Sequence, residues 1–126
     1  MNHGYDFIGF RLKRSIDSFV NELSVEQIIE AMKKNGYEQT KGMYIRFSDD
    51  EKRVTSACAF GQAALNLMPS NFELRAVSHL ANAIHNHAIL KFQEFENVTY
   101  WNDDLDMTVE DIATTLEGLY KESLKK

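Results

Sequence analysis

The sequence predicts an α+β fold in one domain, with four main helices arranged around a small antiparallel hairpin or a three-stranded sheet. Three observations indicate this class. Apolar residues recur at three- and four-residue spacing over most of the chain, which is the period of amphipathic helices. That period is lost between residues 37 and 55, where aromatic and β-branched residues follow turn residues, a pattern typical of strands. One proline and six glycines in 126 residues leave no linker that would divide the chain.

Two helices are expected in the first third of the chain. The apolar stripe of residues 6–22 predicts an amphipathic helix. Ser24 and Gln27 have the spacing of a capping box, in which each side chain bonds the backbone N–H of the other residue, so a second helix begins there. We expect the whole chain to form a single domain, in which the N-terminal helix (residues 1–23) is peripheral to a core of residues 24–120.

A β-hairpin is expected next, followed by an unusual helix. Residues 43–47 and 53–55 flank a polar loop and are rich in aromatic and β-branched side chains, so they predict two paired strands. Residues 56–68 predict a helix that has small residues on several faces. A helix that is small and apolar on most sides is buried among its neighbours, and we expect this helix to be central.

The C-terminal half predicts two further helices and a short strand. Ser70 and Glu73 repeat the capping-box spacing, so a helix is expected from there to about residue 87. Residues 97–101 contain β-branched and aromatic side chains and suit a short strand. The apolar stripe of residues 109–124 predicts the last helix.

An acidic stretch before the last helix raises the question of a metal site. A calcium-binding EF-hand loop that began at Asp104 would need glycine and glutamate where Val109 and Thr115 stand, so that site is excluded. Oxygen ligands for a looser divalent site remain at Asn102, Asp103, Asp104 and Asp106. We favour a helix start instead, because Thr108 is a good N-cap and acids in the first turn complement the helix dipole. No metal ion or cofactor is therefore predicted.

Acidic residues are concentrated in the last third of the chain. The net charge is -5, from 19 acids and 14 bases, and there is no Lys or Arg between Lys91 and Lys121. An acidic surface there would repel nucleic acid and attract a basic protein, so a protein partner is predicted and nucleic-acid binding is unsupported. Candidate binding residues are Glu94, Glu96, Asp103, Asp104 and Asp106. The alternative is that these charges only keep the surface solvated.

Cys58 is a candidate nucleophile because it lies near the start of a predicted helix, where the dipole stabilises a thiolate. Histidines and an acid follow it in the order that a thiol hydrolase uses. The candidate catalytic residues are Cys58, His79, His85 and Asp103. The alternative is a buried structural cysteine, because its neighbours Ala57, Ala59 and Gly61 are small. The histidines lack the spacing of helical zinc ligands.

The predicted location is the cytoplasm. The N-terminus lacks the basic and apolar regions of a signal peptide. No apolar run approaches the roughly 18 residues that span a bilayer, so no membrane association is expected. A single cysteine cannot form an intrachain disulfide, which fits a reducing compartment.

Three short motifs together resemble a small family of bacteriophage and bacterial proteins that share a domain of unknown function. These motifs are Gly36 followed by Tyr37, CAFGQAA at residues 58–64, and Trp-Asn-Asp at residues 101–103. The resemblance covers roughly residues 24–120, and Gln62 stands where the family has a small residue. It implies a shared fold and a phage or bacterial origin, with the host cytoplasm as the location of a phage-encoded protein. It implies no mechanism, because the family has no established activity.

The two longer motifs are expected to meet in space. If the helix of residues 56–68 lies against the Trp-Asn-Asp segment, Asn102 and Asp103 hydrogen-bond N–H groups at the start of that helix or of the last helix. Their role would be architectural. From these features we expect a small cytoplasmic, phage-encoded protein that acts by binding another macromolecule. The alternative is a thiol-dependent hydrolase that uses Cys58 with a histidine.

Overall fold

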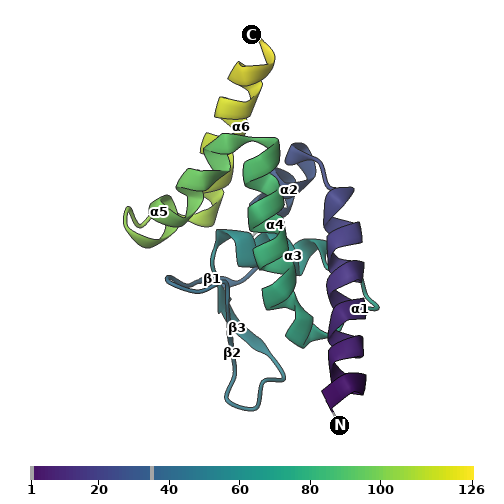
Figure 1. The fold of residues 1–126 in the computed structure, drawn as a ribbon. Coiled ribbons are helices and arrows are strands. Elements are labelled where there is room, and N and C mark those ends of the chain that lie inside the picture. Colours follow the sequence, from purple (N-terminus) through teal and green to yellow (C-terminus); the bar gives the residue numbers. More distant parts are fainter. Residues whose placement is uncertain (1, 35) are drawn as a thin grey trace.

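Helices form most of the structure, and one small sheet lies beside them (Figure 1). The computed structural model describes the backbone of residues 2–34 and 36–126 and the side chains of residues 12–34 and 36–126. The α-helices in this part of the chain are α1 (Asn2–Asn21), α2 (Val25–Lys33), α3 (Ala59–Leu67), α4 (Val77–Lys91), α5 (Val98–Asp103) and α6 (Val109–Leu124). Two 3-10 helices, η1 (Leu74–Ala76) and η2 (Gln93–Asn97), precede α4 and α5. The predicted α+β class in a single domain is confirmed.

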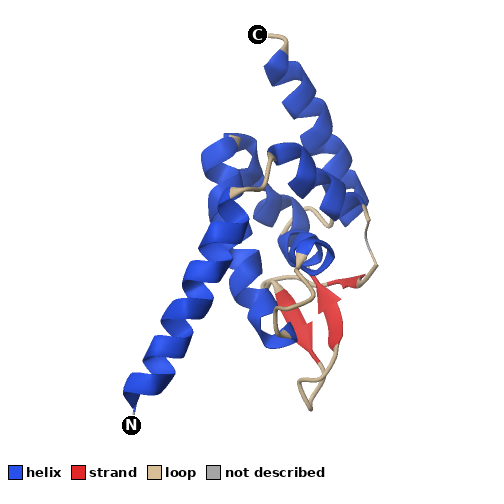
Figure 2. Ribbon diagram, turned by 90° about the vertical axis from the view of Figure 1, so that its right-hand side faces the viewer, coloured by secondary structure: helices blue, strands red, loops and turns tan. Residues whose placement is uncertain are grey.

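The sheet has three strands, in the order β1 (Glu38–Gln39), β3 (Val54–Ala57) and β2 (Ile45–Phe47). β2 and β3 are antiparallel, with Ile45 opposite Ala57, so the predicted hairpin is confirmed. β1 lies parallel to β3 on its other side. Figure 2 shows the strands (red) on one side of the central helices and α1 on the other.

Local capping interactions begin α2 and α6 where the sequence predicts. Ser24 accepts the N–H of Gln27 at 3.1 Å, and the Gln27 side chain accepts the N–H of Ser24 at 2.8 Å. The hydroxyl of Thr108 accepts the N–H of Asp111 at 3.0 Å, and α6 begins at the next residue, Val109. Such caps satisfy N–H groups that have no partner inside the helix, and each stabilises the fold by about 1 kcal/mol.

The centre of the hydrophobic core is α3, which contacts both α2 and α4. Ala59, Ala63 and Ala64 are fully buried, and their short side chains let the neighbouring helices approach closely. Ile28 of α2 and Leu80 of α4 are fully buried in the same core. Each such side chain contributes about 2 kcal/mol relative to an exposed one. The central position predicted for this helix is confirmed.

Two of the predicted helix starts are wrong. α3 begins at Ala59, since Ser56 and Ala57 complete β3 and pair with both neighbouring strands. The capping box predicted at Ser70 and Glu73 does not form. Those residues belong to a turn, and η1 leads into α4, which continues past the predicted end.

The strand predicted at residues 97–101 is also wrong. η2 and α5 occupy this part of the chain, and Phe95 and Val98 point into the core. A strand requires a neighbour with free N–H and C=O groups, and none of the three strands pairs with residues 97–101. The strand preference of β-branched and aromatic residues depends on such a neighbour, and tertiary packing overrides it here.

α1 covers the opposite side of the central helices from the sheet (Figures 1 and 2). It packs against α4 and buries Ile16 and Val20. Among the described residues, no helix has the length and apolar character needed to cross a membrane.

Candidate functional site

A pocket of about 280 Å³ lies at the N-terminal end of α3. Four segments supply its lining: Gly42, Met43 and Tyr44 before β2; Cys58, Ala59 and Phe60 at the start of α3; His85 of α4; and Val98, Thr99, Asn102 and Asp103 of α5. Three of the four candidate catalytic residues therefore share one site. The fourth, His79, is exposed on α4 and is not part of the lining.

Gly61 allows α3 to lie directly against the start of β2. A Cβ atom at this position would overlap the carbonyl oxygen of Tyr44 and lie 2.9 Å from Cδ1 of Ile45. The same Tyr44 carbonyl accepts the N–H of Cys58 at 3.0 Å. The glycine in the CAFGQAA motif thus holds Cys58 beside Tyr44, and this contact builds one wall of the pocket.

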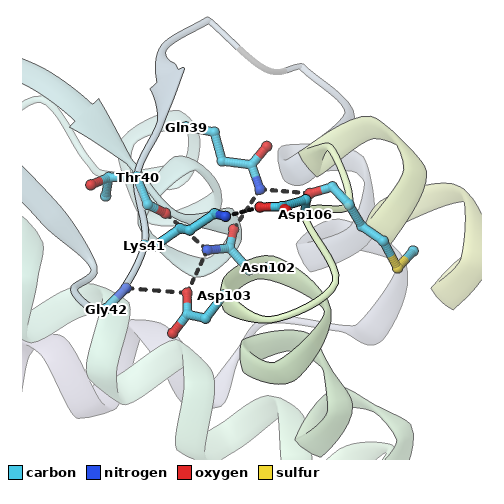
Figure 3. A network of polar contacts seen from close by, with 8 residues as sticks. Gln39, Thr40, Lys41, Gly42, Asn102, Asp103 and Asp106 are labelled. Atoms are coloured by element: carbon cyan, nitrogen blue, oxygen red, sulfur yellow. Dashed lines mark hydrogen bonds and ion pairs between the residues drawn. The ribbon is translucent and has the colours of Figure 1, made fainter.

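Asn102, which lines the pocket, joins three segments by hydrogen bonds. Figure 3 shows its bonds to Gln39, Thr40 and Asp103. Its Oδ1 accepts the N–H of Ala59 at 3.2 Å and a hydrogen of Gln39 Nε2 at 2.8 Å. Its Nδ2 donates to the carbonyl of Thr40 and to Oδ1 of Asp103, both at 2.8 Å. An asparagine amide offers two donors and two acceptor sites, so the capacity of this buried side chain is fully used.

The neighbouring acids hold the turn before β2 (Figure 3). Oδ1 of Asp103 accepts the N–H of Gly42 at 3.1 Å. Gly42 has a φ of +75°, a conformation that is unstrained for glycine. Asp106 forms an ion pair with Lys41. Two of the acids in this segment, Asp103 and Asp106, therefore already contact other residues of the protein.

The two motifs that were expected to meet do so, and the predicted hydrogen bonds are half right. Asn102 bonds the first N–H of α3, as predicted. Asp103 does not bond a helix start and accepts the N–H of Gly42 instead. The reason is its place at the end of α5, where its carboxylate faces the turn before β2 (Figure 3).

Cys58 is the N-cap residue of α3 and is buried, with 9 % of its surface exposed. Burial raises the pKa of its thiol, because a thiolate is poorly solvated there. The N–H groups of Gly61 and Phe60 lower this pKa in part, and the Asp103 carboxylate raises it further. The thiol is therefore protonated at neutral pH, and the helix dipole does not activate it.

His85 is held in a fixed orientation inside the pocket wall. Its ring stacks on Phe60, with 4.3 Å between centroids and 15° between planes. Its Nδ1 lies 2.8 Å from the hydroxyl of Tyr44, which donates its one hydrogen to Oδ1 of Asn82 at 3.1 Å. In this arrangement Nδ1 of His85 carries the ring hydrogen and Nε2 is an acceptor. Burial lowers the pKa of His85, so the ring is neutral at pH 7.

These protonation states decide which chemistry the pocket supports. A cysteine hydrolase needs a thiolate, or a base in hydrogen-bond contact with the thiol. The hydrogen bond of His85 goes to Tyr44 rather than to Cys58, and the Cys58 thiol keeps its proton. Among the described residues, the pocket therefore holds neither a thiolate at neutral pH nor a histidine in hydrogen-bond contact with the Cys58 thiol.

The other candidate binding residues lie outside the pocket lining. Glu96 of η2 and Asp104, which follows α5, are exposed. Glu94 is half-buried and accepts a hydrogen bond from Asn97 at 3.0 Å. Within residues 2–34 and 36–126, no group of three or more His, Cys, Asp or Glu side chains is placed to hold a metal ion.

Sequence reasoning missed Tyr44, Phe60 and Gln39. Tyr44 contacts His85, which lies 41 residues further along the chain, and Gln39 bonds Asn102 over 63 residues. No local pattern carries such information. The only available signal was that Tyr44 is an aromatic residue within the predicted strand of residues 43–47, and strand packing explained it equally well.

The site thus belongs to a small α+β protein whose pocket is built from a turn and three helices. Comparisons with family models, with curated proteins and with solved structures found no match.

Proposed function

We propose that this protein acts by binding another macromolecule. We further propose that its partner is a basic protein that contacts the acidic side of the molecule, which we define by Glu96, Asp103 and Asp104. The charge of the pocket wall carries this proposal. Among the described lining residues, Asp103 bears the formal charge, because His85 and Cys58 are neutral. No Lys or Arg occurs between Lys91 and Lys121, so η2, α5 and most of α6 contribute acids alone.

Two exposed acids are free to meet such a partner. Neither Glu96 nor Asp104 makes a side-chain hydrogen bond or ion pair with a described residue, whereas Asp106 is paired with Lys41. Charges of this kind at the rim of an interface mainly accelerate association and exclude wrong partners. Binding is therefore expected to weaken as salt is raised.

Charge reversal at the acidic side tests the proposal. The resemblance to phage proteins supports a bacterial extract as the source of the partner. The wild type is expected to retain one specific basic protein, and the double variant Glu96→Lys, Asp104→Lys is expected to lose it. The matched control is Asp17→Lys, Glu22→Lys, which makes the same charge change at exposed positions of α1 and the turn after it.

Purified wild type and both double variants are then compared for binding to the identified protein at 0.05 and 0.3 M salt. Equal binding by both double variants, or affinity that does not change with salt, would show that the acidic side is not the contact surface.

A thiol-dependent hydrolase is the second candidate, and one observation favours it: Cys58, His85 and Asp103 line one pocket. The raised pKa of the thiol and the absence of a Cys58–His85 hydrogen bond count against it. Alkylation by iodoacetamide at pH 7 separates the two candidates. A thiol that reacts as fast in the folded protein as in urea would favour the hydrolase.

A further inference from the structure

We infer that the pocket at the start of α3 receives a lysine side chain of the basic partner, an inference that rests on the proposed function. The size of the pocket supports a single side chain. Its volume of about 280 Å³ lies just below the range of roughly 300–1,000 Å³ that is typical of sites for drug-sized ligands. One long side chain fits a pocket of this size.

The apolar part of the wall suits the aliphatic stem of a lysine. Phe60 and Val98 are buried in this wall, and Met43 is 46 % exposed. Long cationic side chains bury their methylene groups against such surfaces and keep the charged end at a polar group. An ammonium group needs acceptors at that end of the pocket.

Four of the residues that line the pocket use hydrogen-bond donors inside the fold. Gly42 and Ala59 donate their N–H groups to side chains of α5. Asn102 donates both amide hydrogens, and the hydroxyl of Tyr44 donates to α4. A helix N-terminus usually attracts anions, but the first N–H of α3 is occupied here. The sulfur of Cys58 faces the next two N–H groups.

Acceptors, in contrast, remain free. Oδ2 of Asp103 is not hydrogen-bonded to a described residue, since both recorded bonds of this carboxylate involve Oδ1. Nε2 of His85 also has no described partner, because its hydrogen bond is made through Nδ1. A ligand with several N–H donors and a positive charge complements these atoms, and no cationic group of the wall repels it.

Lysine fits this acceptor set better than arginine. A guanidinium group binds a carboxylate most strongly through two parallel hydrogen bonds, one to each oxygen. Oδ1 of Asp103 already accepts two hydrogen bonds, so it is not free for the second. An ammonium group is compact and donates three hydrogens in different directions, which suits separate acceptors such as Oδ2 of Asp103 and Nε2 of His85.

Titration of the isotope-labelled full chain with blocked tripeptides, followed by NMR of the backbone amides, tests the inference. The probe is Ala-Lys-Ala, compared with matched peptides in which norleucine, acetyl-lysine or arginine replaces the lysine. We expect the lysine peptide to shift the amides of residues 42–44 and 58–60. Shifts of equal size with norleucine or acetyl-lysine, tighter binding of the arginine peptide, or no shift with lysine would overturn the inference.

Two substitutions locate the binding site. Thr99→Lys places a cation at the pocket lining and is expected to abolish the shifts, whereas Thr114→Lys makes the same change at an exposed position of α6 and is expected to leave them unchanged. Asp103→Asn keeps the acceptor for the N–H of Gly42 and removes the charge. It is expected to weaken binding about tenfold, and unchanged affinity would contradict the role of the carboxylate.

The outcome separates this inference from the proposed function. A partner that is captured through Glu96 and Asp104 but binds Thr99→Lys as well as the wild type would leave the proposed function intact and overturn the pocket inference. Loss of capture in Thr99→Lys, but not in Thr114→Lys, would support both. Spermidine serves as a free polyamine, and if it bound more tightly than the lysine peptide, a partner side chain would not be the ligand.

Discussion

Substitution of Asn102 by Ala is the most direct test of how the pocket is held together. The side chain is 2 % exposed and makes four hydrogen bonds. Its removal leaves the N–H of Ala59 and the carbonyl of Thr40 without partners, and both residues are buried. A buried backbone group that loses its partner costs about 1–3 kcal/mol. Two such groups give about 2–6 kcal/mol, so we expect the free energy of unfolding to fall by about 4 kcal/mol.

Urea unfolding at 25 °C, followed by circular dichroism at 222 nm, measures this loss. With a slope of about 2 kcal/mol per molar urea, the midpoint is expected to fall by about 2 M. Asp104→Ala is the control, because this neighbouring side chain is exposed and its removal is expected to change stability by less than about 0.5 kcal/mol. Native-state hydrogen exchange adds a local measurement, since the Ala59 amide loses its acceptor.

The result that would refute this reasoning is a loss of less than about 1 kcal/mol. It would mean that water replaces the Asn102 amide at Ala59 and Thr40, and that the network in Figure 3 is not structural. Asn102→Asp gives an independent check. It keeps the acceptor for Ala59 but places an acceptor against the Thr40 carbonyl, so it is expected to destabilise the fold at neutral pH as well.

Four further predictions concern the same region and one helix cap. Gly61→Ala is expected to cost about 3 kcal/mol or more, because its Cβ would overlap the Tyr44 carbonyl; a urea midpoint equal to that of wild type would refute it. Cys58 is expected to react slowly with iodoacetamide at pH 7 and faster only above the ordinary thiol range near pH 8.5, since burial raises its pKa; a fast reaction at pH 7 would contradict this. Burial lowers the pKa of His85, so the unfolded chain binds more protons below about pH 6.5 and stability falls as pH drops from there. Urea unfolding curves at pH 7.5 and 5.5 measure this loss of stability. His85→Gln is expected to show a smaller pH dependence of the free energy of unfolding, and an unchanged pH dependence would mean that another group causes it. Thr108→Ala is expected to cost about 1 kcal/mol, and no change in the urea midpoint would mean that this cap is not needed.

The elements that were predicted correctly depend on interactions within a few residues. The capping box at Ser24 and the N-cap at Thr108 join groups three positions apart. A stretch of four residues therefore contains the whole pattern that predicts each of them. The small residues of α3 are a similar case, because a helix without large side chains on most faces is stable only inside a core.

Elements that were predicted wrongly depend on distant partners. Residues 97–101 have the composition of a strand, but most of them belong to α5, which buries Val98 in the core. Ser56 and Ala57 suit a helix, but they pair with both neighbouring strands. Core packing decides the first case and strand pairing decides the second, and neither is visible in the local sequence.

The candidate site was also predicted only in part from the sequence. Its members Cys58, His85 and Asp103 were named from chain order, and Asn102 was expected to bond the first turn of the Cys58 helix. Chain order left open whether these groups react or bind.

The local sequence therefore determines where α2 and α6 begin, which helix is buried, and that the last third of the chain is acidic. The tertiary structure alone assembles the pocket, because its lining comes from four separate segments between Gly42 and Asp103. It also sets the protonation states of Cys58 and His85, since burial acts on both groups and depends on every neighbour that excludes water. Because of that burial, the cysteine and histidine that the sequence offers as a nucleophile and base are both uncharged at neutral pH.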